Sequence, residues 1–339
     1  MKPAIEWQQS CATAENEQFA ADLHVALART PKAISPKYFY DEAGSRLFEQ
    51  ICELPEYYPT RTELALLEAH AADMVEQFGP GVQLVEYGAG ALRKVRLLLD
   101  AMPHDGVQFV PVDISGSHLL AASDALAADY PRLSIQPLVA DFTRPHTLPP
   151  WPKDCRRVGF FPGSSIGNFT PEEADTFLRL AADELAGGGL LIGIDLVKDE
   201  ATLHAAYNDA EGVTAAFNLN LLEHARRVLG AEFPQDGFEH LAFYNPAHCR
   251  IEMHLRATRP LALQVGGEIY AFDEGETLHT EHSHKYTVDG FQAMAVRAGF
   301  KPGKVWTDVN GWFAVLWLES EGGEYSPRGT AGPTRACGS

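Results

Sequence analysis

The chain has 339 residues, of which 45% are hydrophobic, and a formal net charge of −19. This length accommodates one large or two ordinary domains with a sizeable core, and the acidity disfavours nucleic acid or an anionic membrane surface as a partner. Five scattered cysteines without a C-x-x-C pair, and no apolar leader or stretch of transmembrane length, predict a soluble cytoplasmic protein without a zinc framework.

The N-terminal part of the chain combines helical periodicity with aromatic turns. Apolar residues at helical spacing predict a helix over residues 17–30. Two tyrosine-rich turns follow within residues 34–63, and their rings could fill a core or their hydroxyls could line a small polar pocket. Thr60 and Glu63 have the spacing of a capping box, which predicts a helix over residues 61–78.

The most informative stretch is the sequence LVEYGAG at residues 84–90, which predicts a buried strand that runs into a glycine turn. Gly88 and Gly90 allow a ligand to approach the backbone, and the first amides of a helix over residues 91–102 favour an anionic or hydrogen-bond-accepting group. The third glycine of a dinucleotide fingerprint is absent. With Glu86 two residues before Gly88, the pattern resembles motif I of class I S-adenosylmethionine-dependent methyltransferases, although an ordinary strand–turn–helix fits as well.

Acidic residues end the next two predicted strands. A strand over residues 107–115 contains Asp113, at the distance from the glycine turn where a carboxylate accepts both ribose hydroxyls of a nucleotide. A further strand over residues 133–139 is followed by Asp141 and Phe142. This pair could bind an adenine amino group and cover its ring, or Asp141 could cap a helix.

The segment after the strand at residues 157–161 contains G-x-S-x-G at residues 163–167, the pattern of a hydrolase nucleophile elbow with Ser165 as nucleophile. An elbow requires a helix directly after the serine. Here the capping box that begins at Thr170 places the helix start about five residues too late. The pattern therefore disfavours a hydrolase, and we expect Asn168 to face a substrate crevice at the end of a parallel strand.

After an apolar strand at residues 190–196, the α/β rhythm breaks. Residues 198–286 combine helices with strand-like runs and indicate an inserted second lobe. A helix at residues 288–298 and a final antiparallel pair of strands complete the α/β pattern. The Gly/Ser/Pro-rich residues 321–339 are expected to form a disordered tail.

A histidine cluster, His279, His282 and His284, lies near the end of the inserted lobe. In a strand, His282 and His284 share one face, whereas Glu281 and Ser283 share the other. No further ligand spacing is visible in the sequence, so we predict no metal site. The run is then either a polar surface or a place where Glu281 and Ser283 grip a substrate side chain.

Six of these stretches resemble the histidine Nα-methyltransferases of ergothioneine biosynthesis, over about residues 20–319. They are residues 34–48, 54–63, 86–90, 163–171, 195–199 and 280–285. The resemblance implies an α/β fold with a Rossmann-like class I methyltransferase sheet and a second, smaller substrate-binding lobe. It implies the cofactor S-adenosylmethionine, the substrate L-histidine and the product hercynine. The implied division is a methyltransferase domain at 61–197 and 287–320, and a substrate-binding domain at 15–60 and 198–286.

The resemblance also implies roles for single residues. The cofactor-binding set is Gly88, Gly90, Lys94, Asp113, Asp141, Phe142 and Ser165. The catalytic pair is Tyr40 and Asn168, and the substrate-binding set is Tyr57, Phe48, Asn168, Tyr207, Met253, Glu281 and Ser283. In the substrate set, Glu281 and Ser283 grip the imidazole, whereas Tyr57, Asn168 and Tyr207 hold the carboxylate and amine. The glycine turn departs from the family in lacking small hydroxyl residues, which should weaken one cofactor contact.

Alternatives from other classes stay open at this point. The chain could methylate another, aromatic amino acid, and Glu281→Ala should then leave turnover unaffected. It could also be a non-catalytic amino-acid-binding module of the same fold, whereas the missing third glycine disfavours an NAD-dependent oxidoreductase. We expect a monomer whose partner is a small-molecule amino acid, with neither nucleic acid nor membrane involved.

Overall fold

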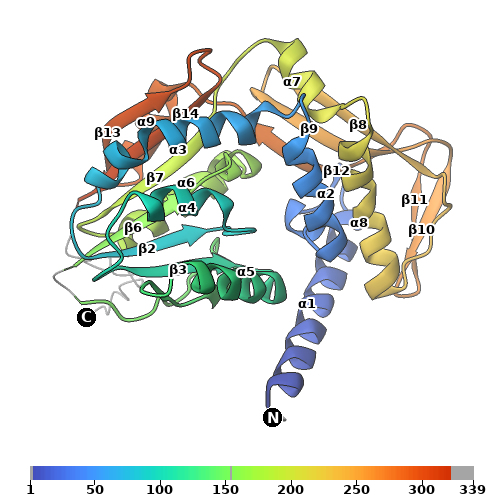
Figure 1. Cartoon of the computed structure of the whole chain (residues 1–339). Helices are drawn as coiled ribbons and strands as arrows, with labels where there is room; N and C mark the ends of the chain where they lie inside the picture. Colours follow the sequence, from blue (N-terminus) through green and yellow to red (C-terminus); the bar gives the residue numbers. More distant parts are fainter. Residues whose placement is uncertain (1–2, 153–154, 322–339) are drawn as a thin grey trace, which may run out of the picture.

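A central mixed sheet organises the larger lobe of the protein (Figure 1). The computed structural model describes residues 3–152 and 155–321, and within these ranges the sheet has eight strands. In spatial order they are β13 (Phe300–Thr307), β14 (Phe313–Ser320), β7 (Gly189–Asp195), β6 (Arg156–Phe161), β2 (Val82–Tyr87), β3 (Gln108–Asp113) and β4 (Ser134–Ile135), with β5 (Leu138–Val139) also paired to β3.

The order of the strands confirms the predicted Rossmann-like class I methyltransferase fold. The first strand of the lobe, β2, lies in the middle, and the chain winds outward through β3 on one side and through β6 and β7 on the other, with parallel pairing. Strand β14 then inserts antiparallel between β7 and β13. The reversal of winding beside β2 creates a crevice at the carboxyl ends of the strands, where such sheets bind ligands.

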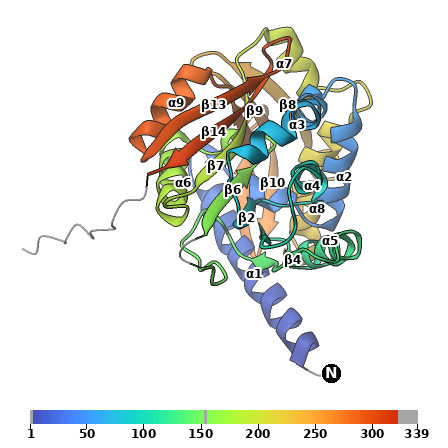
Figure 2. The same cartoon turned by 60° about the vertical axis from the view of Figure 1, so that its left-hand side comes forward.

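Helices cover both faces of this sheet, as Figure 2 shows from a turned view. One face packs against α3 (Tyr58–Glu76), α4 (Arg93–Asp100) and α5 (Gly116–Asp129). The other packs against α6 (Pro171–Glu184) and α9 (Val288–Arg297). Each helix turns its apolar residues to the sheet, which is why strands such as β2 and β7 are buried along their whole length.

The second lobe has its own sheet and its own core. The sheet order is β1 (Lys32–Ala33), β12 (Thr277–His284), β9 (Arg250–Ala257) and β8 (Phe238–Asn245). Around it lie α1 (Pro3–Ala28), the 3₁₀ helix η1 (Pro36–Phe39), α2 (Glu42–Glu53), α7 (Glu200–Tyr207), α8 (Val213–Leu229) and the hairpin of β10 (Leu261–Val265) and β11 (Glu268–Phe272). Strand β1 pairs in parallel with β12, so the N-terminal segment joins the inserted segment in one sheet.

The buried apolar residues group into three clusters. Buried apolar residues of 19–58 and 203–278 form one cluster, whereas those of 66–196 and 291–318 form two others, one on each face of the large sheet. We therefore propose that 15–60 with 198–286 is one domain and 61–197 with 287–320 the other. The predicted tail at 321–339 lies, apart from residue 321, outside the described residues.

Three local predictions are wrong, each for a steric or hydrogen-bonding reason. The strand expected over 133–139 is split into β4 and β5, with Pro137, whose ring fixes its φ, at the break. Helix α3 begins at Tyr58, so Thr60 lies inside it and forms no capping box with Glu63. The helix after the glycine turn begins only at Arg93, because Leu92 has a φ of 54°.

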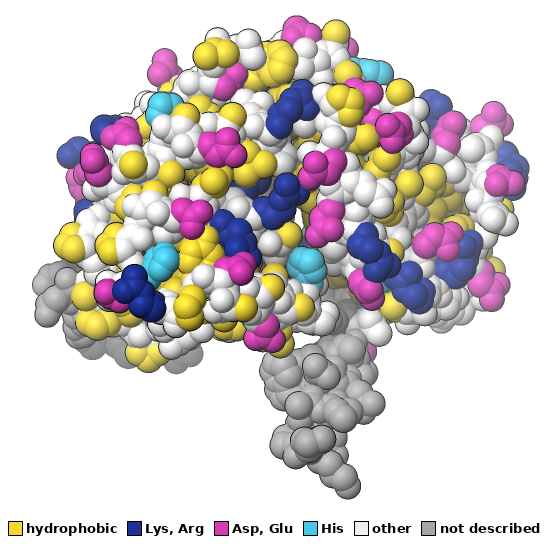
Figure 3. All heavy atoms as spheres, viewed as in Figure 1, with side chains coloured by type: hydrophobic (Ala, Val, Ile, Leu, Met, Phe, Trp, Pro, Cys, Tyr) yellow, Lys and Arg dark blue, Asp and Glu magenta, His cyan; other side chains and the backbone are white. Residues whose placement is uncertain are grey.

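Other local predictions are confirmed. The capping box at Thr170 and Glu173 forms, with Pro171 in the first turn of α6, and Phe19 is buried on α1 as its spacing predicts. Among the described residues, no helix is both long and apolar enough to cross a membrane. On the face viewed in Figure 3, basic and acidic side chains are interspersed over both lobes.

Candidate functional site

The glycine turn after β2 is built from backbone hydrogen bonds to the end of β3. The amides of Gly88 and Ala89 donate to the carbonyl of Val112 at 2.9 and 3.1 Å, and the amide of Gly90 donates to Oδ2 of Asp113 at 3.0 Å. Gly88 has a φ of 68° and a Cβ there would lie 3.4 Å from the ring of Phe142. The turn therefore needs glycine at this position and fixes the Asp113 carboxylate beside it.

A cleft of about 1120 Å³ opens at this turn, between the two lobes. All seven residues predicted to bind the cofactor line it: Gly88, Gly90, Lys94, Asp113, Asp141, Phe142 and Ser165. Asp141 accepts a hydrogen bond from the amide of Thr143 at 3.0 Å and precedes a turn, so the alternative that it caps a helix is wrong. Phe142 packs 5.5 Å from Phe161, measured between ring centroids.

Lys94 is held in the cleft by a buried carboxylate that the capping-box prediction misplaced. Glu63, which is 1% exposed, pairs with the Lys94 ammonium at 2.6 Å and accepts the amide of Gly163 at 2.9 Å. A Cβ on Gly193 would lie 2.2 Å from Oε1 of Glu63. Glycine at 193 therefore makes room for the carboxylate that joins α3, α4 and the loop after β6.

Glu86 is a further acidic residue at the cleft, and its environment is unusual. It is 2% exposed, and its Oε2 atom has no hydrogen-bond partner in the described part of the chain. Burial raises the pKa of Glu86 well above its ordinary value, although Lys94 opposes the shift. An unpartnered buried carboxyl beside a glycine turn is suited to a ligand that brings its own hydrogen-bonding groups.

The residues around the cleft fit S-adenosylmethionine. Asp113 and Asp141 suit ribose hydroxyls and an amino group, Lys94 suits a carboxylate, and the unpartnered Glu86 needs a ligand partner. Ser165, by contrast, is no hydrolase nucleophile: its hydroxyl donates to the carbonyl of Pro162 at 3.0 Å, and the 3₁₀ helix η2 (Ser165–Asn168) separates it from α6.

A small cavity of about 60 Å³ adjoins the cleft on the side of the second lobe. All eight residues predicted as catalytic or substrate-binding line it: Tyr40, Phe48, Tyr57, Asn168, Tyr207, Met253, Glu281 and Ser283. Tyr40, Asn168 and Glu281 also line the cleft, so the two spaces are continuous. The residues come from both lobes, which explains why their separation in sequence is so large.

Aromatic rings form one wall of this cavity. The ring centroids of Tyr40 and Phe48 lie 5.6 Å apart, those of Phe48 and Tyr57 lie 6.3 Å apart, and those of Tyr57 and Tyr207 lie 6.3 Å apart, all edge to face. Burial raises the pKa values of the Tyr40 and Tyr57 hydroxyls well above their ordinary value. Both phenols are therefore neutral, and they can donate or accept a hydrogen bond without acting as phenolate bases.

Glu281 is the acidic residue of the cavity. It is 7% exposed, and burial raises its pKa to about 7, against the opposing effect of Lys285. The amide of Asn168 donates to its Oε2 at 3.4 Å. Glu281 pairs with Met253 across the sheet, and Ser283 with Ile251, so both polar side chains point to the cavity from the same face of β12, as their spacing predicts.

A bulge in β12 sets which side chains share this face. The pairing register shifts between His279 and Glu281, so Thr280 is an extra residue in the strand. Thr280 is buried and donates to the side chain of Asn218 at 2.7 Å. Without the bulge, His279 would share a face with Glu281. With it, His279 lies on the opposite face, beside His282.

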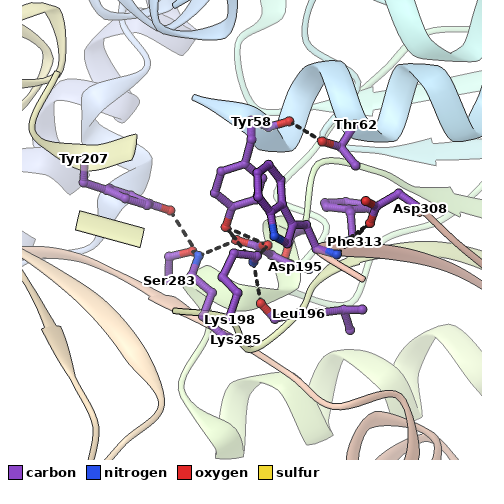
Figure 4. A network of polar contacts seen from close by, with 12 residues as sticks. Tyr58, Thr62, Asp195, Leu196, Lys198, Tyr207, Ser283, Lys285, Asp308 and Phe313 are labelled. Carbon is purple, nitrogen blue, oxygen red and sulfur yellow. Dashed lines mark hydrogen bonds and ion pairs between the residues drawn. The ribbon is translucent and has the colours of Figure 1, made fainter. Parts of the chain in front are cut away.

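A buried network of charges joins the cavity to strand β7 (Figure 4). The Asp195 carboxylate pairs with two ammonium groups, Lys198 at 2.6 Å and Lys285 at 2.8 Å, and the hydroxyl of Tyr58 donates to it at 2.7 Å. Burial lowers the pKa of Lys198 to about 8 even though Asp195 opposes the shift. For Lys285, Asp195 and Tyr207 outweigh the effect of burial, so its pKa is raised.

Lys285 connects this network to two predicted substrate-binding residues, Ser283 and Tyr207. Its ammonium donates to Oγ of Ser283 at 2.8 Å and to the hydroxyl of Tyr207 at 3.3 Å. Figure 4 shows both side chains turned toward Lys285, Ser283 from β12 and Tyr207 from α7. The orientation of the cavity's polar groups therefore depends on Asp195, which lies on the other lobe.

The sequence matches known proteins over most of its length. A family profile described as histidine-specific, SAM-dependent methyltransferase matches residues 19–320. This chain belongs to that methyltransferase family. It is 41% identical over 304 residues to a protein of Mycolicibacterium smegmatis named histidine N-alpha-methyltransferase, covering 88% of this chain and 94% of that protein. A protein of the same name from Mycobacterium tuberculosis is 42% identical over 299 residues, covering 87% and 92%.

A more distant relative is longer than this methyltransferase. Ergothioneine biosynthesis protein 1 of Neurospora crassa is 29% identical over 299 residues, which cover 83% of this chain and 32% of that protein.

Sequence reasoning missed three groups that complete the site of this methyltransferase. In the sequence, Glu63 fits a helix cap, Glu86 is part of the glycine-turn motif, and Lys285 has no local pattern that indicates a role. The signal for Lys285 was its place in the family stretch at 280–285, and Asp195 and Lys198 lie in another such stretch. What the sequence could not reveal is that these stretches meet.

Proposed function

We propose that this methyltransferase transfers methyl groups from S-adenosylmethionine to the α-amino group of L-histidine, up to three times, and so forms hercynine for ergothioneine biosynthesis. The observation that carries the proposal is a cavity that is lined by the buried carboxylate of Glu281 and opens onto the glycine-turn cleft. The family and the names of the two mycobacterial relatives support the same reaction.

In this proposal the cleft holds the cofactor. Asp113 accepts the ribose hydroxyls, Asp141 and Phe142 bind the adenine, and Lys94 pairs with the cofactor carboxylate. The glycine turn and Ser165 complete the contacts. When bound, S-adenosylmethionine supplies a methyl group on a positively charged sulfur, which is open to attack by an amine.

The cavity holds histidine by its two ends. Glu281 and Ser283 accept and donate hydrogen bonds at the imidazole, and Tyr57, Asn168 and Tyr207 hold the α-carboxylate and the amine. The rings of Tyr40 and Phe48, with Met253, form the apolar wall. A cavity with a buried carboxylate selects imidazole because an apolar side chain leaves that carboxylate without a partner.

Methyl transfer requires little more from the protein than alignment of the amine. The amine attacks as the free base, since its lone pair forms the new N–C bond while the S–C bond breaks and its electrons stay on sulfur. The neutral hydroxyl of Tyr40 and the Asn168 amide orient that lone pair, and the amine proton leaves to solvent before each further transfer. Positioning of this kind accounts for much of the barrier reduction in enzymes. The aromatic wall suits the quaternary ammonium product.

We further propose a monomer that acts in the cytoplasm on a small-molecule substrate. Cys52, Cys155 and Cys249 are free thiols among the described residues, which suits a reducing compartment.

Turnover measured by mass spectrometry tests this proposal. Incubation with S-adenosylmethionine and L-histidine should yield histidine carrying one, two and finally three methyl groups, with S-adenosylhomocysteine formed in equal amount to the methyl groups transferred. A panel with phenylalanine and tyrosine serves as control and should show little turnover. Absence of any mass gain on histidine would reject the proposal. Methylation of the aromatic amino acids instead would favour the second substrate class, and calorimetric binding of histidine without S-adenosylhomocysteine release would favour a binding module.

A further inference from the structure

Behind the histidine cavity, strands β9 and β12 share a second, polar face. Cross-strand pairs place Arg250 beside His284, Glu252 beside His282, and His254 beside His279. These residues alternate with Met253, Glu281 and Ser283, which face the cavity. The bulge at Thr280 brings His279 onto this polar face. The histidines of β12 therefore lie beside Glu252 and His254 of β9.

The imidazoles of this face form a continuous row. The ring centroids of His254 and His279 lie 4.8 Å apart, those of His279 and His282 lie 5.5 Å apart, and those of His282 and His284 lie 5.1 Å apart. In the described part of the chain, the Nε2 atoms of His279, His282 and His284 are buried and have no hydrogen-bond partner. Buried polar atoms are rarely left unpaired, and of these three histidines it is His279 that lies together with His254 and Glu252.

Three groups in this row converge on one point. One atom each of Glu252, His254 and His279 lies within 4.8 Å of the others, and Nε2 of His254 is 3.1 Å from Oε2 of Glu252. A divalent ion binds nitrogen and oxygen ligands at roughly 2.0–2.2 Å. Two ligand atoms around such an ion lie at most about 4.4 Å apart, so the pair at 3.1 Å already fits, and rotation of the side chains has to bring the three groups together around the ion.

Outer contacts orient two of the three ligands. The other oxygen of Glu252, Oε1, accepts hydrogen bonds from Asn245 at 2.9 Å and Arg250 at 2.8 Å, which leaves Oε2 for the imidazoles. The other nitrogen of His254, Nδ1, lies 3.2 Å from Oγ1 of Thr277, which presents Nε2 to the site. Partners of this kind fix ligands in metal sites. Arg250 opposes a cation, but it contacts the oxygen that points away.

We propose that Glu252, His254 and His279 form a binding site for a divalent transition-metal ion. Two imidazoles and a carboxylate favour ions such as Zn²⁺ over Mg²⁺ or Ca²⁺. The bound ion joins β9 to β12 and so braces the two strands whose opposite face carries Met253, Glu281 and Ser283.

Calorimetric titration of the chelator-treated, untagged chain with ZnCl₂, without histidine or S-adenosylmethionine, tests the site. One Zn²⁺ should bind per chain, whereas MgCl₂ should give no binding at the same concentration. Glu252→Gln and His279→Gln should each weaken Zn²⁺ binding at least tenfold. The matched control, His284→Gln, removes an imidazole of the same row outside the three-ligand group and should leave binding unchanged.

Two further measurements make the outcome independent of folding defects. Zn²⁺ should raise the melting temperature of the wild-type chain and of the His284→Gln control, but not that of His279→Gln, whose circular dichroism should match wild type. Co²⁺ should give visible absorption without a thiolate band. The proposal is overturned if the wild-type chain binds no Zn²⁺, if His279→Gln binds as tightly as wild type, or if His284→Gln loses as much affinity as the ligand variants. None of these measurements involves methyl transfer, so the proposed reaction and the metal site stand or fall separately.

Discussion

Replacing Glu281 with glutamine is expected to lower kcat/KM for L-histidine by about 100-fold, the cost of one lost charge-assisted hydrogen bond in a buried site. The loss follows from the position of the carboxylate, which lines the cavity and is 7% exposed. Steady-state kinetics with S-adenosylmethionine at saturation measures the effect. Glu172→Gln, an exposed carboxylate at the rim of the cleft, is the control and should behave as wild type.

The same substitution is expected to stabilise the protein at alkaline pH. The ordinary pKa of glutamate is 4.5, and burial raises that of Glu281 to about 7. The folded state therefore holds the proton more tightly, and this residue costs stability progressively as the pH rises from about 4.5 to about 7. At 1.36 kcal/mol per pKa unit the full cost is on the order of 3 kcal/mol. Urea denaturation at pH 4.5 and pH 8 should show that Glu281→Gln gains relative to wild type only at pH 8.

Two results would contradict this account of Glu281. Unchanged turnover of histidine by Glu281→Gln would favour the alternative of another amino acid substrate. A stability difference between variant and wild type that is the same at pH 4.5 and pH 8 would show that the carboxylate is not held in its protonated form by burial.

Asp195→Asn is expected to destabilise the fold by roughly 3–5 kcal/mol, the range for removing one partner from a buried ion pair. The substitution leaves two ammonium groups, Lys198 and Lys285, without their counterion in a region where both side chains are at most 4% exposed. Urea denaturation measures the loss. The control is Asp199→Asn, which alters only an exposed helix cap and should cost about 1 kcal/mol or less.

A double substitution separates charge pairing from packing in this network. Combining Asp195→Asn with Lys285→Met should cost less than the sum of the two single substitutions, since the second removes a charge that the first leaves unpaired. Lys285→Met alone should raise the KM for histidine, because Ser283 and Tyr207 lose the group that orients them. Additive costs, with a KM equal to wild type, would show that the network has no part in positioning the site.

The sequence predicts well those parts of the site that depend on local sequence patterns. Strand alternation alone places Glu281 and Ser283 on one face, and a glycine turn after a buried strand places Asp113 at the next strand end, because parallel strands end at a common edge. The late helix start at Pro171 likewise follows from its cap. In each case the deciding interaction joins residues close in sequence or neighbours in a regular sheet.

The parts that it predicts poorly depend on contacts between distant segments. Glu63 fits a capping box locally, but its carboxylate is drawn to Lys94 and the amide of Gly163, a contact that no pattern in residues 54–63 reveals. The bulge at Thr280 changes the face on which His279 lies. Its extra residue, Thr280, donates a hydrogen bond to Asn218 of α8, which is distant in sequence. The histidine run alone therefore predicts no metal site.

A crystal structure with S-adenosylhomocysteine and Nα,Nα-dimethylhistidine tests the central claim most directly. The account predicts that an imidazole nitrogen lies within about 3.2 Å of the Glu281 carboxylate and that the dimethylamine points past Tyr40 and Asn168 toward the sulfur in the cleft. An amino acid bound elsewhere, or one with its imidazole turned away from residue 281, would contradict it.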